Sequence, residues 1–64
     1  MNTLGERVKY LRMSHHMSQM RLAAAAGCAQ ARIAEIESGR NITSKHTIRL
    51  ANALDVDPMW LAEG

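Results

Sequence analysis

The stretch from Ser18 to Gly39, SQMRLAAAAGCAQARIAEIESG, decides the fold of this chain. It is typical of two short helices with a tight turn between them. Ser18 offers a side-chain oxygen to a free backbone N–H at the start of the first helix. Gly27 supplies the left-handed residue that ends this helix, and the second helix begins almost at once, near Gln30. The stretch therefore predicts a helix, a turn and a second helix.

The two predicted helices must cross steeply, because the turn between them is short and contains glycine. Such a crossing needs small residues, and Ala23 and Ala26 are small. On the second helix Ile33 and Ile36 share one side, with Glu37 beside them. The other side carries polar or short side chains: Gln30, Ala31, Ala34 and Glu35. A polar face alone is typical of any solvated helix, so it does not by itself indicate a function.

The more specific signal is a set of short segments at fixed spacing: Ser18-Gln19, Leu22-Ala23, Gly27, Ile33, Ile36-Glu37 and Gly39. This pattern resembles the helix-turn-helix of the lambdoid phage repressor and Cro family. The resemblance extends from Leu4 to Gly64 and includes a closing segment over residues 56–61, VDPMWL, like the family's last helix. It implies an all-α, compact five-helix domain over residues 1–64, in which the second helix of the motif enters the major groove of DNA.

The composition fits a small cationic domain. Sixty-four residues allow one domain, whose core supplies only ~3–5 kcal/mol of net stability. The chain has eight lysines and arginines and six acidic residues. Three of the acidic residues, Asp55, Asp57 and Glu63, lie in the last ten residues. The rest of the chain is therefore clearly cationic, which suits a polyanionic partner.

Several other classes of protein are disfavoured. A single cysteine, Cys28, forms no internal disulfide, and the start MNTLGERVK is no secretory signal, so we expect the reducing cytoplasm of a bacterial host. No apolar stretch approaches the roughly 18 residues that span a bilayer, so no membrane partner is expected. Tyr10 and Trp60 are too few aromatics for a single-strand stacking platform.

No catalytic or metal-binding constellation is present in the sequence. Cys28 has no catalytic His and acid placed to serve it, so a structural thiol is expected and an enzyme is not. His15 and His16 are adjacent ligands without a Cys, Asp or third His at helical spacing, and His46 lies far along the chain. Such a pair makes a poor metal site, so we expect no metal and no cofactor.

The first helix should begin at Thr3, because Thr3 and Glu6 form a capping-box pattern. Its buried stripe is predicted from the helical spacing of Leu4, Val8 and Leu11. Arg7 and Lys9 fall on other faces, where we expect them to serve solubility. His16 stands just past this helix, where similar sequences usually place glycine, so a left-handed backbone is expected there.

The remaining helix starts are also marked. Thr43 is a plausible cap for a helix with one face made of Thr47, Leu50, Ala51 and Leu54. Asp57 and Pro58 open the last helix as a capping acid and a proline at the first helical position. Ala29 replaces the usual Ser or Thr cap of the groove-entering helix, which should weaken its first turn by ~0.5–2 kcal/mol.

The resemblance implies that four residues read bases: Gln30, Ala31, Arg32 and Glu35. The amide of Gln30 can accept from N6 and donate to N7 of adenine, and the methyl of Ala31 suits a thymine methyl. Glu35 has two alternatives, accepting from cytosine N4 or pairing with Arg32 at i, i+3. We favour the pairing, because an unpaired carboxylate near phosphates is repelled.

Other residues are expected to contact DNA phosphates, to form a structural ion pair or to join two protomers. Phosphate contacts are expected at Gln19, which starts the first motif helix, and in and after the basic connection: Arg40, Asn41, Thr43, Ser44 and Lys45. By its family position, Arg12 should form a structural ion pair with Glu37. Pro58, Met59 and Trp60 are the candidate dimer contacts, with the basic loop, because nothing follows the last helix.

The sequence thus predicts a phage or prophage repressor that binds double-stranded DNA at an approximate palindrome and occupies a promoter. The free chain should be a monomer or a weak homodimer that assembles on DNA. The alternative is a protein-interaction module of the same fold, such as the antitoxin half of a toxin–antitoxin pair, and five methionines would suit an adaptable surface. Whether the chain is a complete Cro-like protein or the amino-terminal domain of a longer repressor stays open, as do the operator sequence and the genes controlled.

Overall fold

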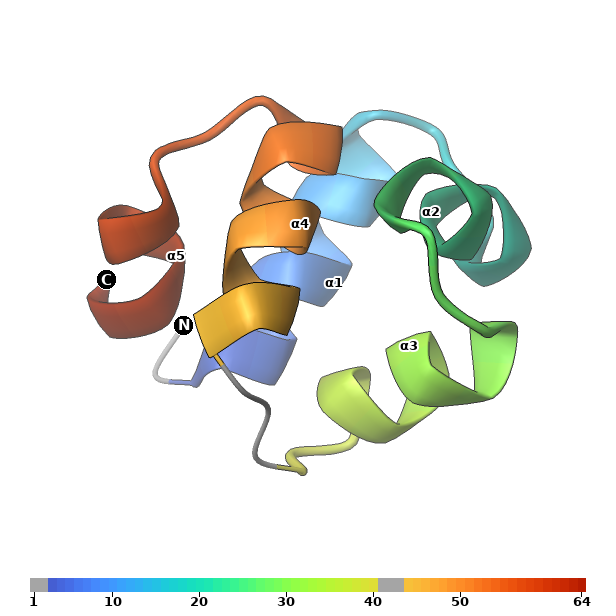
Figure 1. The fold of residues 1–64 in the computed structure, drawn as a ribbon, viewed down its shortest axis with the longest axis horizontal. Helices are drawn as coiled ribbons and strands as arrows, with labels where there is room; N and C mark the ends of the chain where they lie inside the picture. The colour runs from blue at the N-terminus through green and yellow to red at the C-terminus, as the bar shows by residue number, and fades with distance from the viewer. Residues whose placement is uncertain (1–2, 41–43) are drawn as a thin grey trace.

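The computed structural model describes residues 3–40 and 44–64, and it folds them into five α-helices (Figure 1). The helices are α1 (Leu4–Ser14), α2 (Gln19–Ala26), α3 (Gln30–Glu37), α4 (Ser44–Leu54) and α5 (Pro58–Glu63). No helix in this described part is both long and apolar enough to cross a bilayer. The predicted five-helix, all-α fold is therefore confirmed.

Local side-chain caps mark the starts of α1, α2 and α5, as the sequence predicts. Thr3 Oγ1 accepts from the N–H of Glu6 at 3.1 Å, and the Glu6 carboxylate accepts from the N–H of Thr3 at 3.1 Å. Ser18 Oγ accepts from the N–H of Arg21 at 3.0 Å. Asp57 caps α5, while Ala29 makes no side-chain cap bond at the start of α3. The predicted cap of α4, Thr43, lies outside the described residues.

Several residues in the turns between helices adopt positive φ angles. Gly27 ends α2 with φ 74°, as predicted. His16 has φ 56° in the turn after α1, which confirms the expectation drawn from its position. Asp55 has φ 59° after α4, and the sequence interpretation did not anticipate it. Aspartate and histidine are among the non-glycine residues that tolerate this region best.

All five helices contribute to one apolar core. Its buried members are Val8, Leu22, Ala23, Ala26, Ile33, Ile36, Leu50, Ala51, Leu54 and Leu61. The predicted faces of α3 and α4 are confirmed, whereas the stripe of α1 is fully buried only at Val8, with Leu4 and Leu11 partly covered. Cys28 is half-buried against the same core. The core thus holds both helices of the motif in place, with α4 packed against α2 and α1 packed against α3.

α1 and α4 lie in the middle of Figure 1. α5 lies on one side of them, and α2 and α3 lie on the other. α1 packs against both α3 and α5. The contact with α3 is close at Gly5, where an added Cβ would overlap the carbonyl oxygen of Ile36 and lie 3.2 Å from Glu37 Cα. A residue without a side chain is therefore needed at Gly5, and the end of α3 is brought directly against α1.

Arg7 has a different role from the predicted one. We expected it in solvent beside Lys9, but its side chain is only 5% exposed. Its Nε donates to the carbonyl oxygen of Leu61 at 2.7 Å, and its Nη2 donates to that of Ala62 at 2.9 Å. These carbonyls belong to the last turn of α5, whose acceptors lack partners within the helix. The prediction was wrong because α5 folds back over α1, whereas Lys9 is indeed exposed.

Candidate DNA interface

α3 has one face fixed in the core and one face directed outward. Ile33 and Ile36 are 0% and 1% exposed. The opposite face begins with three exposed residues, Gln30, Ala31 and Arg32. Because both isoleucines are buried, the helix cannot rotate about its axis without losing core contacts. The structure therefore presents the predicted base-reading residues in a fixed orientation.

A bidentate ion pair joins the end of α3 to α1. Arg12 Nε lies 2.7 Å from Glu37 Oε2, and Arg12 Nη2 lies 3.1 Å from Glu37 Oε1. The third donor of the guanidinium, Nη1, reaches the carbonyl oxygen of Met17 at 2.8 Å. The side chain of Glu37 is 5% exposed and that of Arg12 is 14% exposed. The structure thus contains the predicted pair, and both of its members are held by further contacts.

The electrostatics of this pair favour the charged state. The hydrogen bond to Glu37 raises the pKa of the Arg12 guanidinium above its ordinary value, against the opposing effect of burial. Since the pKa is raised in the folded state, Arg12 is charged at neutral pH, and its stabilising effect is lost only as the pH rises through the arginine range. Arg12 is therefore a permanent structural cation.

Gln19 joins the same group. Its Nε2 donates to Glu37 Oε1 at 3.2 Å, so Arg12, Gln19 and Glu37 form one unit, which we call the inner cluster. The sequence interpretation assigned Gln19 only to a phosphate. A glutamine amide carries two donors, so one N–H remains for a phosphate after the bond to Glu37. The inner cluster therefore fixes the first residue of α2 relative to the end of α3.

A second acid–base group, the outer cluster, lies on the exposed side of α3 and consists of Arg32, Glu35 and Arg40. Arg32 Nη1 is 3.7 Å from Glu35 Oε1, and Arg40 Nη1 is 4.0 Å from Glu35 Oε2. The exposed fractions of the three side chains are 48%, 41% and 73%. The pair with Arg32 was favoured from the sequence. The pair with Arg40 was missed, because it depends on Gly39, whose φ of 107° turns the chain back toward α3.

The remaining phosphate candidates flank the connection between α3 and α4. Arg40 precedes it and Lys45, which is exposed, follows it at the start of α4. Asn41 and Thr43 lie outside the described residues, and for Ser44 only the backbone at the start of α4 is described.

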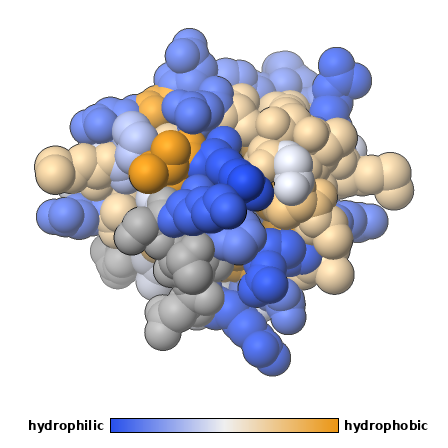
Figure 2. Space-filling view, viewed as in Figure 1, coloured by the Kyte–Doolittle hydropathy of each residue, from blue (hydrophilic) through white to orange (hydrophobic). Residues whose placement is uncertain are grey.

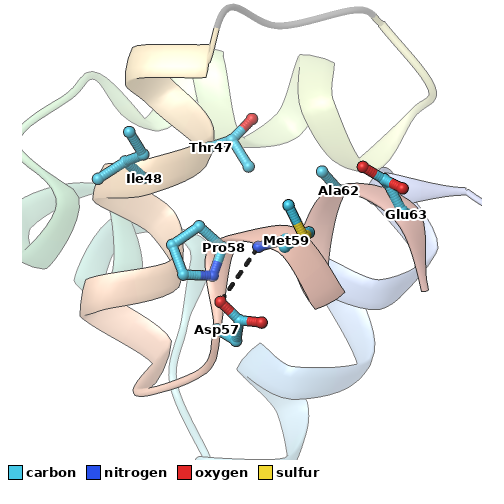
Figure 3. A pocket seen from close by; sticks show the side chains of 7 residues that line it. All are labelled: Thr47, Ile48, Asp57, Pro58, Met59, Ala62 and Glu63. Atoms are coloured by element: carbon cyan, nitrogen blue, oxygen red, sulfur yellow. Dashed lines mark hydrogen bonds between the residues drawn. The ribbon is translucent and has the colours of Figure 1, made fainter.

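The candidate dimer residues form part of an apolar surface on α4 and α5. Met59 is 68% exposed and Trp60 is 39% exposed, while Pro58 is half-buried. Ile48, which the sequence interpretation did not single out, is 50% exposed on α4. A hollow of about 360 Å³ lies between these helices, lined by Ile48, Pro58 and Met59 among others (Figure 3). Figure 2 shows a strongly hydrophobic area where the two helices meet.

Comparison with known proteins identifies the family. A model of the helix-turn-helix family matches residues 8–61. The chain belongs to this family. All of its 64 residues align at 38% identity with two HTH-type transcriptional regulators, for conjugative element R391 of Providencia rettgeri and for conjugative element SXT of Vibrio cholerae. The chain spans 30% of the length of each regulator.

Solved structures give the same family. The P22 c2 repressor in complex with a synthetic operator superposes with a TM-score of 0.91 at 25% identity, covering 100% of this chain and 98% of that chain. The restriction-modification controller protein C.AhdI from Aeromonas hydrophila gives a TM-score of 0.86 at 34% identity, with 91% and 89% of the two chains covered. The chain is therefore a helix-turn-helix protein of the phage repressor type.

The family assignment also settles the class of protein. The two curated relatives are transcriptional regulators, so this helix-turn-helix domain is not an enzyme domain. Within residues 3–40 and 44–64, no three His, Cys, Asp or Glu side chains come together as metal ligands. The surface formed by α3 and its flanking residues is the candidate functional site.

Proposed function

We propose that this chain is a transcriptional repressor that binds specific double-stranded DNA through the outer face of α3. The observation that carries the proposal is the fixed orientation of α3, with Ile33 and Ile36 buried and Gln30 at the exposed start of the helix. Two similar proteins were solved with DNA, the P22 c2 repressor and SinR, the latter at 28% identity with a TM-score of 0.86. These relatives support placing α3 in the major groove.

In this arrangement the first turn of α3 reads base edges. Gln30 makes a two-point contact with adenine, accepting from N6 and donating to N7, which no other base pair allows. Ala31 contacts a thymine methyl. Arg32 reaches a base edge or a phosphate, and Glu35 acts through its pair with Arg32 or accepts from cytosine N4.

Phosphates on either side of the groove position the domain. Gln19 offers its free amide N–H and the N-terminal end of α2 to one strand. Arg40, which follows α3, and Lys45, near the start of α4, contribute positive charge, and Asn41, Thr43 and Ser44 contribute uncharged donors. Such contacts fix the register of the protein on DNA without selecting the sequence.

Repression follows from occupancy of a promoter by two protomers. A two-fold dimer on an approximate palindrome places one α3 in each half-site, about one helical turn apart. Pro58, Met59 and Trp60 are the proposed contacts between protomers, and the exposure of Met59 and Trp60 supports this role. The protein would act in the cytoplasm of a bacterial cell, where the DNA is.

Binding to random duplex DNA at several salt concentrations separates the proposal from its alternative. The proposed repressor should bind duplexes with an affinity that falls linearly, on a log–log scale, as the salt concentration rises. A protein-interaction module has no reason to show this dependence. The exposed Ile48 and Met59 favour that alternative, and absence of DNA binding at low salt would establish it over the repressor.

Assembly on DNA is tested with duplexes that carry one or two half-sites. Binding to the two-site duplex should be cooperative in protein concentration, while sedimentation at micromolar concentration should show mostly monomer. Trp60→Ala should weaken binding to the two-site duplex and leave the preferred bases unchanged. A tight dimer in the absence of DNA, or an effect of Trp60→Ala on a single half-site, would contradict the proposed contact.

A further inference from the structure

We propose that Glu35 is a specificity-determining positioning residue, which restrains Arg32 and Arg40 from the phosphates of non-cognate DNA. The inference rests on the proposed function, since it requires that the outer face of α3 meets DNA. It goes beyond that function because it assigns Glu35 a role against the wrong sequences. The residue would lower non-specific affinity more than specific affinity.

The geometry gives each carboxylate oxygen of Glu35 its own arginine. Oε1 faces Arg32 Nη1 at 3.7 Å, and Oε2 faces Arg40 Nη1 at 4.0 Å. The two arginines come from opposite sides, one from within α3 and one from the segment after Gly39. Glu35 is thus the shared partner of Arg32, which is a predicted base-reading residue, and of Arg40, which is a predicted phosphate contact.

Stabilisation of the fold does not explain this arrangement. All three side chains are between 41% and 73% exposed, and exposed pairs at such distances add little to stability. The turn after α3 is held by other bonds. Arg40 N–H donates to the carbonyl oxygen of Glu35 at 3.1 Å, and Ser38 Oγ donates to the same oxygen at 2.8 Å. Neither bond involves the carboxylate, so the carboxylate is not needed for the turn.

The charge of Glu35 affects how strongly the outer cluster attracts DNA. Non-specific binding comes from cations that meet phosphates, and the carboxylate reduces the formal charge of the outer cluster from +2 to +1. An arginine in a weak, exposed pair gains most where DNA offers a bidentate acceptor in a fixed place, such as O6 and N7 of guanine. On a cognate site that acceptor is present for Arg32. On other sites the arginines keep their contacts with Glu35. The phosphates then repel the negative charge of Glu35, which lowers non-specific affinity.

The test is the substitution Glu35→Gln, which keeps the shape of the side chain and removes its charge. Affinity for a random duplex, measured by fluorescence anisotropy from low to moderate salt, should rise several-fold at low salt. The slope of log affinity against log salt should steepen by about 0.9 for each phosphate contact that a released arginine makes. Affinity for the selected operator should change less, so the ratio of specific to non-specific affinity should fall.

Two further variants make the result specific to the outer cluster. Glu63→Gln removes the same charge from α5, which lies on the opposite side of Figure 1 from α3, and it should leave affinity for the random duplex nearly unchanged. Arg40→Ala in the Glu35→Gln background should remove most of the gain. Thermal melting of every variant confirms that all are folded.

The outcomes separate this inference from the proposed function. If the wild-type protein binds no duplex at low salt, both are overturned. If the wild-type protein selects a sequence but Glu35→Gln behaves like Glu63→Gln on random DNA, only the role of Glu35 is overturned. A gain in Glu35→Gln that persists after Arg40→Ala and Arg32→Ala would show a general charge effect and would also overturn it.

Discussion

The inner and outer clusters contain the same chemistry in two environments. Each has a glutamate of α3 next to an arginine, and the two glutamates, Glu35 and Glu37, are only two residues apart. Glu37 is 5% exposed and lies 2.7 Å from Arg12 Nε. Glu35 is 41% exposed, with its arginine contacts at 3.7 and 4.0 Å. Burial, rather than composition, therefore decides which acid is structural and which is free to respond to a ligand.

The difference follows from where each side of α3 faces. The side with Glu37 lies against α1, where Gly5 allows the close approach. An ion removed from water there must keep its partners, because an unpaired buried charge is costly. On the exposed side, water competes for every charge, so the pairs of Glu35 add little to stability and can yield to a stronger acceptor.

The largest effect is expected in the inner cluster. Arg12→Ala and Glu37→Ala should each lower the free energy of unfolding by about 3 kcal/mol, because each leaves the other charge buried without its partner. The double variant should cost clearly less than the sum of the two. Urea unfolding of the four proteins measures the cycle. Additive losses would mean that burial does not couple these residues.

A second buried guanidinium gives an independent comparison. Arg7→Ala should lower the free energy of unfolding by about 2 kcal/mol, since a buried cation no longer donates to the carbonyls of Leu61 and Ala62. The loss should include detachment of α5, visible as increased hydrogen exchange of its amides. Lys9→Ala is the matched control on the exposed face of α1. Equal losses for the two variants would argue against the buried role of Arg7.

A smaller effect, of opposite sign, is expected at the turn that leads into the inner cluster. His16 has φ 56°, and glycine adopts this angle without strain. His16→Gly should raise the free energy of unfolding by a few tenths to ~1 kcal/mol, less whatever glycine's greater freedom in the unfolded chain offsets. A melting midpoint that falls clearly would show that the left-handed conformation carries no strain.

The smallest stability effect is expected in the outer cluster. Arg32→Ala and Glu35→Ala should each change the free energy of unfolding by about 0.5 kcal/mol or less, and their coupling should be of the same size. The same urea experiments provide the measurement. A coupling as large as that between Arg12 and Glu37 would remove the contrast between the two clusters.

The contrast also shows what the sequence could predict. Caps at Thr3, Ser18 and Asp57 were found because each acts within three residues of itself, and the buried faces of α3 and α4 follow from helical spacing. The left-handed His16 and the pair of Arg12 with Glu37 came from family position. The untested base and phosphate contacts came from the same source and stay predictions.

The features that were missed depend on contacts between distant segments. Arg7 bonds to carbonyls 54 and 55 residues away, and no local pattern distinguishes it from an arginine in solvent. Gly5 was not singled out from the sequence, although the crossing of α1 and α3 requires it. Ile48 joins the surface of Met59 only because α5 packs beside α4. Neither Arg7 nor Gly5 breaks the helical pattern of its segment, so the sequence contained no local sign of these long-range contacts.

Selection of binding sites from random duplexes tests whether α3 reads bases while the residues that flank it contact phosphates. The wild-type protein should enrich an inverted pair of half-sites. Gln30→Ala should cost about 1–3 kcal/mol on the best site and lose the preference at one base pair in each half-site. Lys45→Ala should weaken all duplexes alike and keep the preferred bases. No enrichment by the wild-type protein, or a preference changed by Lys45→Ala and unchanged by Gln30→Ala, would contradict the account.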